Sequence, residues 1–266
     1  MISFMASANF HCVCSTIGTK TKSIISVRVD PKIEYAGRKK RILAKSLFCF
    51  ADGAVFQTDE ARQWFSKKLQ ARSEVIFNPI DHSFFDVDRN SITGKVITCG
   101  RLTNQKNHTL LINAVMSAKK TIPSLELYIY GEGPLKDTLI DYKNKFEFGK
   151  SVYLPGRIEN VLSELRSADL FILSSNFEGM PNALMEALAA GVPSISTDCP
   201  SGGPRELIQN GINGLLVPVG DEELMRESII AMYNTYDRKI ISKMQEKWQG
   251  NMKQVLFVNN GLIIVR

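Results

Sequence analysis

Two glutamates flank the start of a predicted helix in the most informative stretch of the sequence. Glu178 lies in a loop after a strand, and Glu186 lies one and a half turns into the helix that follows. Helical side chains lean toward the N-terminus, so we expect Glu186 to point to the helix start, near Glu178. Carboxylates accept hydrogen bonds from sugar hydroxyls, and free helix-start amides suit a phosphate. This pattern favours a pocket for a sugar joined to a diphosphate over two surface glutamates, with further contacts expected from Gly179, Met180, Pro181 and Asn182.

A second cluster of polar residues follows another predicted strand. Arg101 and Lys106 are two cations in the strand-to-helix loop that begins at Gly100. They are suited to clamp a diphosphate and to stabilise it as a leaving group, although a loop that is merely solvated would also carry such residues. Glycines in neighbouring loops would let the backbone approach a nucleotide closely. These further loop positions are Gly131, Gly133, Gly156, Arg157 and Ile158.

Short apolar runs alternate with helix-length amphipathic segments from about residue 94 onward. Such alternation predicts crossover connections, and therefore a doubly wound α/β domain with a parallel sheet and helices on both faces. Ligands of such sheets bind beyond the carboxyl ends of the strands, at the switch in strand order. The expected strands are 96–99, 125–130, 152–154, 170–173, 194–196 and 215–217, and the expected helices are 108–120, 134–146, 160–168, 181–190, 204–209 and 221–236.

Residues 1–90 are expected to form part of a second α/β domain, with 91–236 as the ligand-binding domain and 237–266 as a helix and an atypical tail. Strands are predicted at 23–29, 54–57 and 75–77. The tail contains a helical segment from Arg238 to Trp248 and a hairpin signal around Asn259-Asn260-Gly261.

A run of five residues, Gly37-Arg38-Lys39-Lys40-Arg41, leads into Ile42, Leu43, Leu47 and Phe48 at helical spacing. A basic amphipathic helix over 38–48 is suited to an anionic membrane surface or an anionic lipid carrier. A solvated basic face over a small core is the alternative interpretation, and the sequence leaves both open.

Composition excludes disordered, collagen-like and coiled-coil proteins. The chain has 266 residues, of which 44% are hydrophobic and 23% charged, with a net charge of +6; these values are typical of globular proteins. The 5 cysteines are an odd number and favour a reducing, cytoplasmic location over a disulfide framework. No apolar run approaches the roughly 18 residues of a membrane span.

Three further signals carry little weight. Asp86-Val87-Asp88 lacks a preceding strand to orient it on a metal ion, and Cys12-Val13-Cys14 lacks a second pair of ligands. His82 and His108 are isolated and are expected at the surface or in caps. No nucleic-acid motif accompanies the positive charge. We therefore expect neither a metal cofactor nor a nucleic-acid partner.

The motifs together resemble a known family. GRLTNQKN, YGEGPL, LPGR, SNFEGMPNALMEALAAGVPSISTDCPSGGPREL and NGLLVP are similar to the donor-binding domain of the retaining GT-B glycosyltransferases of family 4. Glu178 and Glu186 match the E-x7-E motif of that family. The resemblance covers about 94–236, and 1–90 is similar to the second half of the N-terminal domain. The segment STDCPSGGPREL is most similar to the corresponding segment of enzymes that build glycans on undecaprenyl-diphosphate carriers, including N-acetylgalactosaminyltransferases.

The resemblance implies roles for these residues. Arg101 and Lys106 would bind the donor diphosphate, Glu186 the ribose hydroxyls, and Glu178 the hydroxyls of the transferred sugar. The amides after Gly179 would touch the donor, and 156–158 would lie by the base. The donor would be a nucleotide-sugar, with UDP as the nucleotide, and the acceptor a glycan or a lipid-linked oligosaccharide. Retention of configuration is implied by the family alone.

The chain also departs from the family. Members usually carry about one hundred more residues at the N-terminus, and a histidine that many have near the cleft would fall around Arg28. A truncated nucleotide-sugar-binding remnant or subunit is therefore the alternative hypothesis to an active transferase. A sugar-nucleotide epimerase of the same fold is a third hypothesis, which lacks evident catalytic residues. We expect a cytoplasmic protein, peripheral on the inner membrane face if 38–48 binds lipid.

Overall fold

The computed structural model describes residues 1–85 and 93–235, and its contacts divide the chain into two compact units. The first unit comprises Met1–Asn78, Phe177–Met180 and Pro200–Glu206, and the second comprises Pro79–Asn176, Pro181–Cys199 and the chain from Leu207. Two short later segments thus group with the N-terminal residues. The D-x-D at 86–88, the helix expected at 238–248 and the hairpin expected around 259–261 lie outside the described residues.

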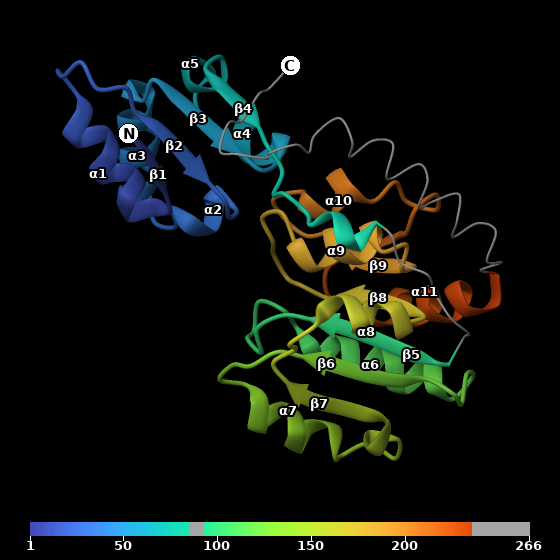
Figure 1. The fold of residues 1–266 in the computed structure, drawn as a ribbon. Helices are drawn as coiled ribbons and strands as arrows, with labels where there is room; N and C mark the ends of the chain where they lie inside the picture. Colours follow the sequence, from blue (N-terminus) through green and yellow to red (C-terminus); the bar gives the residue numbers. More distant parts are fainter. Residues whose placement is uncertain (86–92, 236–266) are drawn as a thin grey trace. The chain divides into compact units, whose positions relative to one another are not determined.

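A parallel sheet of four strands, in the order β1-β2-β3-β4, forms the centre of the first unit (Figure 1). β2, β3 and β4 lie close to the three strands that the sequence predicts. The elements are β1 (Ile2–Phe4), α1 (Ala6–Thr16), β2 (Ile24–Val27), α2 (Pro31–Glu34), α3 (Arg38–Leu47), η1 (Phe48–Phe50), β3 (Gly53–Phe56), α4 (Asp59–Gln63), α5 (Lys67–Gln70) and β4 (Ser73–Val75).

β1 and α1 were not predicted, because polar residues interrupt their hydrophobic pattern. Ser3 and Asn9 are buried. The Ser3 hydroxyl donates to Asn9 Oδ1 (2.7 Å), and the Asn9 amide donates to the Ser26 carbonyl (2.9 Å). Buried polar groups are stable when they are paired in this way. The contact also fixes α1 against β2, which pairs with β1 in parallel register.

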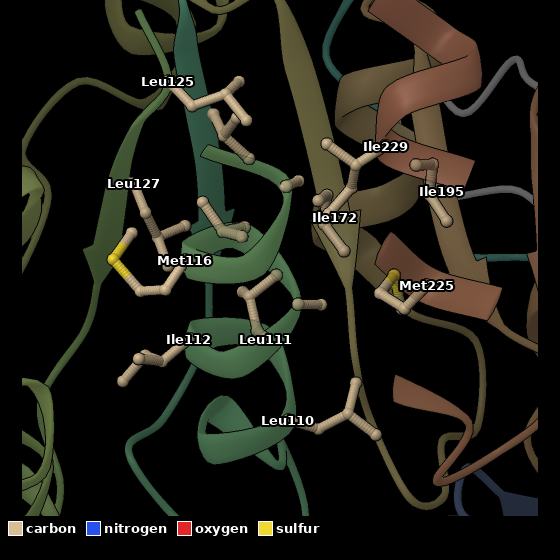
Figure 2. Close-up of a cluster of buried hydrophobic side chains, with 14 of the residues drawn as sticks. Leu110, Leu111, Ile112, Met116, Leu125, Leu127, Ile172, Ile195, Met225 and Ile229 are labelled. Atoms are coloured by element: carbon tan, nitrogen blue, oxygen red, sulfur yellow. The ribbon is translucent and has the colours of Figure 1, made fainter. Parts of the chain in front are cut away.

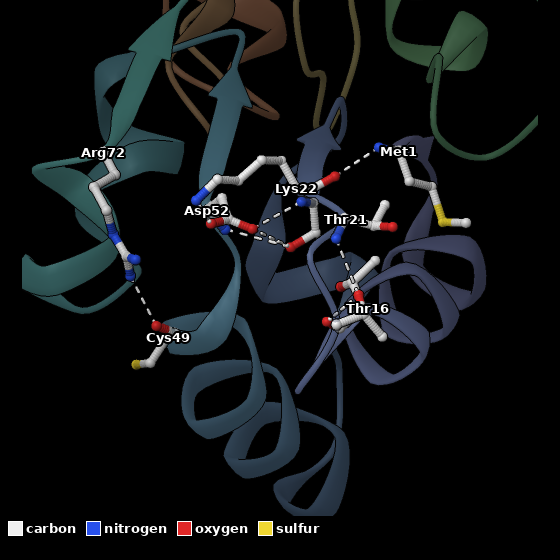
Figure 3. Close-up of polar contacts among 9 residues, drawn as sticks. Met1, Thr16, Thr21, Lys22, Cys49, Asp52 and Arg72 are labelled. Atoms are coloured by element: carbon white, nitrogen blue, oxygen red, sulfur yellow. Dashed lines mark hydrogen bonds and ion pairs between the residues drawn. The ribbon is translucent and has the colours of Figure 1, made fainter.

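Hydrogen bonds link the amino ends of the strands in the first unit. The Asp52 carboxylate accepts from the Ser23 backbone N–H (2.9 Å) and from Lys22 Nζ (2.9 Å), as Figure 3 shows. These bonds lower the pKa of Asp52, the backbone bond most strongly. Arg72 donates to the Cys49 carbonyl (2.8 Å) on the far side of β3. The residues before β2, β3 and β4 are therefore linked to one another at the amino ends of these strands.

The basic helix α3 forms as predicted, but its apolar residues divide between two environments. Phe48 is buried and packs edge-on against Tyr35, with 5.6 Å between ring centroids. Ile42 and Leu43 are instead 59% and 51% exposed. The expected single apolar face is therefore wrong in part, since Phe48 belongs to the aromatic core of the unit while Ile42 and Leu43 face solvent.

The second unit contains a parallel sheet of six strands in the order β10-β9-β8-β5-β6-β7 (Figure 1). This confirms the predicted doubly wound α/β fold, with the switch in strand order between β5 and β8. The elements are η2 (His82–Phe84), β5 (Lys95–Cys99), α6 (His108–Lys119), β6 (Glu126–Tyr130), α7 (Lys136–Lys143), η3 (Gly149–Ser151), β7 (Val152–Gly156), α8 (Val161–Ser167), β8 (Leu170–Leu173), α9 (Asn182–Ala189), β9 (Ser194–Thr197), α10 (Gly203–Leu207, most of which groups with the first unit), β10 (Leu215–Val217) and α11 (Glu222–Thr235).

The core of the second unit lies between α6 and one face of the sheet (Figure 2). Leu111 and Met116 of α6 pack in one cluster with Leu127 of β6 and Ile172 of β8, and α11 contributes Ile229. Strands β8 and β9 are buried throughout, which explains their uninterrupted apolar or small side chains. This core fixes where β5 and β8 end.

A buried carboxyl in the first unit gives a pH prediction. Burial raises the pKa of Glu34 to about 7, while the Ala6 backbone amide opposes the shift. Among the described residues its Oε2 atom has no hydrogen-bond partner. The unfolded chain releases this proton near the ordinary glutamate pKa, whereas the folded unit keeps it up to about pH 7. The unfolding free energy should therefore fall as the pH rises through that window.

Glu34→Gln should flatten this pH dependence, because it removes the titrating group. The unfolding free energy at each pH is measured by urea unfolding, followed by Trp64 fluorescence in a Trp248→Phe background. Glu74→Gln, at an exposed glutamate of the same unit, should leave the slope of the parent protein unchanged. An identical pH profile for Glu34→Gln and the parent would contradict the prediction.

Candidate functional site

The loops that follow β5 and β8 are joined at the switch point of the sheet. The backbone N–H of Asn176 donates to the Gln105 carbonyl (2.8 Å), and the Ser174 hydroxyl donates to the Lys106 carbonyl (2.8 Å). The side chains of Asn107 and Asn176 also hydrogen-bond to one another (3.1 Å). The loop that carries the two predicted cations is thus anchored to the end of β8, as the strand order requires.

The two cations of this loop differ in environment. The Lys106 side chain passes over Gly100, where a Cβ atom would lie only 2.9 Å from Lys106 Cε. Gly100 therefore provides the space for the aliphatic part of Lys106, which is half-buried. Arg101 is exposed. A guanidinium on the surface of this loop remains available to a ligand, and the Lys106 ammonium is held over the end of β5.

The charges of Glu186 and Lys106 both shift the pKa of one residue, Cys99, at the end of β5. Burial, and after it the charges of Glu186 and Glu164, raise the pKa of the Cys99 thiol to about 12, while Lys106 opposes the shift. Burial also raises the pKa of Glu186 itself. Two of the four residues predicted to carry the chemistry therefore share one electrostatic environment, beside Cys99.

Backbone hydrogen bonds interlock the loops after β5, β6 and β7. Gly100 N–H donates to the Tyr130 carbonyl (2.9 Å), Leu102 N–H to the Glu132 carbonyl (3.0 Å), and Gly131 N–H to the Gly156 carbonyl (2.8 Å). A Cβ atom on Gly131 would collide with the Gly100 carbonyl. The sequence suggested that these glycines make room for a nucleotide, but the space beside Gly131 is filled by the protein's own backbone.

Gly133 is crowded by backbone in the same way, whereas Gly156 is crowded by a side chain. A Cβ atom on Gly133 would lie 2.5 Å from the Leu102 carbonyl oxygen, and one on Gly156 would lie 2.7 Å from the Glu132 carboxylate. Gly156 also has a φ of 90°, which favours glycine. Beyond it, Arg157 is exposed and Ile158 half-buried. Donor contacts from 156–158 stay a prediction.

The loop that contains Glu178 groups with the first unit. Glu178 is buried, its backbone N–H donates to the Pro200 carbonyl (3.0 Å), and its carbonyl accepts from the Ser201 N–H (3.3 Å). A Cβ atom on Gly179 would collide with the Arg28 carbonyl. The interpretation of Glu178 as a surface residue is therefore excluded. Its convergence with Arg101, Lys106 and Glu186 stays a prediction, because those residues group with the second unit.

One expected amide of this loop already has a partner. The Met180 backbone N–H donates to Oε1 of Gln57 (3.3 Å), so the expectation that it is free for a phosphate is wrong in this structure. Helix α9 begins at Asn182, with Pro181 in the N-cap position rather than in the first turn. Asn182 itself is exposed.

Gln57 and Asn78 are positioning residues that the sequence analysis did not identify. Both are buried, and the Gln57 amide donates to Asn78 Oδ1 (2.6 Å) while its oxygen accepts from Met180. The available signal was their position, since each polar side chain comes just after a strand of the first sheet. Their bonds set the backbone next to Glu178.

His108 was expected at the surface or in a cap and is instead buried at the start of α6. Its side chain is 3% exposed, and burial lowers its pKa to about 4, against the opposing influence of the Arg101 carbonyl. His108 is therefore neutral at physiological pH. A neutral ring beneath the Arg101 loop supports this loop without adding a third cation. His82, by contrast, is exposed as predicted.

Comparison with solved structures defines the class of fold. Over 94% of this chain and 74% of the other, the structure matches Anabaena HepE, crystallised with UDP, with a TM-score of 0.80 at 17% identity. It also matches Staphylococcus aureus TarM with a TM-score of 0.77 at 18% identity, over 96% of this chain and 52% of that one. Both are GT-B glycosyltransferases, so the chain has a GT-B fold.

The family model described as Glycosyl transferases group 1 matches residues 93–235, more than half of the chain. The chain therefore belongs to this family. It is 31% identical to an uncharacterized glycosyltransferase of Methanocaldococcus jannaschii, across 74% of this chain and 53% of that protein. It is 28% identical to a Campylobacter jejuni α-1,4-N-acetyl-D-galactosaminyltransferase named for a diphospho-undecaprenol substrate, across 92% of this chain and 68% of that enzyme. The chain thus spans about half the length of the M. jannaschii relative.

Gly133→Ala tests the interlock between loops. The added methyl group would press on the Leu102 backbone, and overpacking of this kind typically costs about 1–3 kcal/mol of unfolding free energy. Urea unfolding followed by circular dichroism measures the loss. Gly53→Ala is the control, because a Cβ atom there would make ordinary contacts at 3.5 Å. A Gly133→Ala protein as stable as the parent would contradict the prediction that the Leu102 backbone leaves no room for a methyl group.

Proposed function

We propose that this protein is a glycosyltransferase that moves a sugar from UDP-sugar to a glycan or a lipid-linked oligosaccharide in polysaccharide biosynthesis. The observation that carries the proposal is the junction of the β5 and β8 loops at the switch point. The charges of Lys106 and Glu186 both influence the pKa of Cys99 there. A cation and an acid at this edge of a parallel sheet suit a nucleotide diphosphate and its ribose.

The proposed roles follow the chemistry of each side chain. Arg101 and Lys106 neutralise the diphosphate and stabilise it as it leaves, without an obligatory metal ion. Glu186 accepts hydrogen bonds from the ribose hydroxyls, and its partial burial strengthens those bonds. Glu178 holds hydroxyls of the transferred sugar, while Gly179 and the start of α9 contact the donor.

We further propose membership of family 4 and retention of configuration. The E-x7-E spacing of Glu178 and Glu186 supports the first. The names of two relatives, the C. jejuni enzyme and a Bacillus subtilis poly(glycerol-phosphate) alpha-glucosyltransferase, specify α linkages. An α-linked UDP-sugar gives an α product when configuration is retained, which supports the second.

Lys106→Ala and Lys106→Met should both weaken UDP binding. Charge-assisted hydrogen bonds contribute about 1.5–3 kcal/mol, so the Kd measured by calorimetry should rise roughly 10-fold to 100-fold. Lys106→Met keeps the aliphatic part over Gly100 and so separates loss of charge from loss of packing. Lys20→Ala, at an exposed lysine of the first unit, serves as the control. An unchanged Kd in Lys106→Met would remove Lys106 from the diphosphate site.

A nucleotide-sugar-binding protein that transfers no sugar is the second candidate function, because Arg28 stands where the family resemblance places a histidine near the cleft. Calorimetry with UDP-sugars followed by a transfer assay on a lipid-linked acceptor separates the two. Binding with turnover supports the transferase, and binding without turnover supports the inactive form. The absence of any UDP binding would overturn both.

We also propose that α3 attaches the protein to an anionic membrane surface. Arg38, Lys39, Lys40, Arg41 and Lys45 are exposed, and none of them forms an ion pair with another described residue. Ile42 lies among them on the solvent side, beside Leu43. Exposed apolar side chains within a cluster of cations match the interface of an anionic bilayer. No helix of the described residues is long and apolar enough to span a membrane.

Vesicle sedimentation tests this attachment. The protein should bind vesicles containing phosphatidylglycerol and not pure phosphatidylcholine, and binding should weaken as salt rises. Ile42→Ser with Leu43→Ser should reduce the bound fraction severalfold, whereas the control Ile212→Ser, at another exposed isoleucine, should not. Equal binding by the double variant and the parent would exclude α3 as the attachment site.

A further inference from the structure

A ladder of three side chains crosses one face of the second sheet and ends at its edge. Lys95 on β5, Tyr128 on β6 and Tyr153 on β7 follow one another across neighbouring strands. Lys95 Nζ lies 4.9 Å from the centre of the Tyr128 ring, and the Tyr128 and Tyr153 rings stack with 4.5 Å between centroids at 18°. Tyr153 lies on the edge strand and is 38% exposed.

This face lies opposite the α6 core. Leu127 and Ile129 point into that core, so the alternation of side chains along β6 places Glu126, Tyr128 and Tyr130 on the other side. There α8 covers part of the sheet, because its Glu164 receives hydrogen bonds from Tyr130 and Lys95. Packing against α8 thus accounts for the Lys95 end of the ladder but not for its Tyr153 end.

Glu126 lies beside the exposed end, where its carboxylate bridges the hydroxyl groups of the two stacked rings. One of its carboxylate oxygens accepts from the Tyr128 hydroxyl (3.0 Å) and the other from the Tyr153 hydroxyl (3.3 Å). Burial and then Glu126 raise the pKa of Tyr128 to about 12, and Glu126 raises that of Tyr153, so both phenols stay protonated. Each oxygen of a carboxylate keeps a further lone pair for a donor from solvent or a ligand.

These groups match the chemistry of a sugar. An aromatic ring face packs against the C–H groups on one side of a pyranose, and a carboxylate accepts hydrogen bonds from its hydroxyls. The charge of Lys95 is neutralised by Glu164, at 2.6 Å, so among the described residues the ladder and Glu126 offer a ligand one carboxylate and no unpaired cation. A neutral, hydroxyl-rich ligand therefore fits, whereas an anionic ligand would be repelled by Glu126.

We propose that Tyr153 and Glu126 form a second carbohydrate-binding site, separate from the nucleotide site, that holds a neutral glycan chain. The proposal rests on the proposed function only for the source of the glycan, the acceptor or product of the transferase. Tyr153 stacks on one sugar unit while Glu126 orients its hydroxyls. Such a site keeps a growing chain on the enzyme between transfers without contacting the reacting atoms.

Affinity electrophoresis of the full chain through gels containing dextran, with chitopentaose titrated by calorimetry, tests the site. The parent should bind at least one of these two neutral probes. Tyr153→Ala should weaken that binding by about tenfold through the loss of ring stacking. Tyr153→Phe, which keeps the ring, should retain most of it, and Glu126→Gln should weaken it. Phe50→Ala, which removes an exposed aromatic ring elsewhere, is the matched control.

The outcomes separate this site from the nucleotide site. The Kd for UDP should be the same in the parent and in Tyr153→Ala, and unchanged circular dichroism should show that the variant folds. Equal glycan binding by Tyr153→Ala and the parent, or no binding of either probe by the parent, would overturn the proposal. Loss of glycan binding with normal UDP binding supports it, and glycan binding by a parent that does not bind UDP would contradict only the transferase assignment.

Discussion

The backbone hydrogen bonds between the loops that follow β5, β6 and β7 are the constraint on which the candidate site depends. Gly100 and Gly131 donate to the last carbonyls of β6 and β7, and Leu102 donates to the Glu132 carbonyl in the loop after β6, at 2.8 to 3.0 Å. The loops approach so closely that Gly131 has no room for a side chain. Loops are usually mobile, but these form one continuous layer, and that layer fixes where the Lys106 and Arg101 side chains begin.

This constraint gives the glycines of the site two different functions. Gly131 and Gly133 allow two stretches of backbone to pack, whereas Gly100 allows the Lys106 side chain to lie across it. All three follow parallel strands in the sequence and look alike there. Sequence position alone places them at the carboxyl ends of the strands, but it does not say whether a ligand, a side chain or another loop fills the space beside them.

Much of the second unit could be predicted from the sequence, because its strands are short apolar or small-residue runs, with β8 and β9 buried throughout, and they alternate with helix-length segments. The alternation of strands and helices predicted a parallel, doubly wound sheet, but the strand order that brings the β5 and β8 loops together came only from the structure. β1 and α1 could not be predicted, since Ser3 and Asn9 occupy core positions and pair with one another there. His108 was misplaced for a related reason, because its neighbours gave no sign that this histidine would be buried and neutral.

The partners of the Glu178 loop were beyond sequence reasoning for a different reason. Gln57 and Met180 are 123 residues apart, and no local pattern connects them. Phe177–Met180 and Pro200–Glu206 pack with residues 1–78, although the chain on either side of each belongs to the second unit. The two units are therefore not two separable stretches of gene. A recombination event or a proteolytic cut near residue 79 would divide Gly179 from the Arg28 backbone and Met180 from Gln57, so these two halves are expected to be inherited and to evolve as one piece.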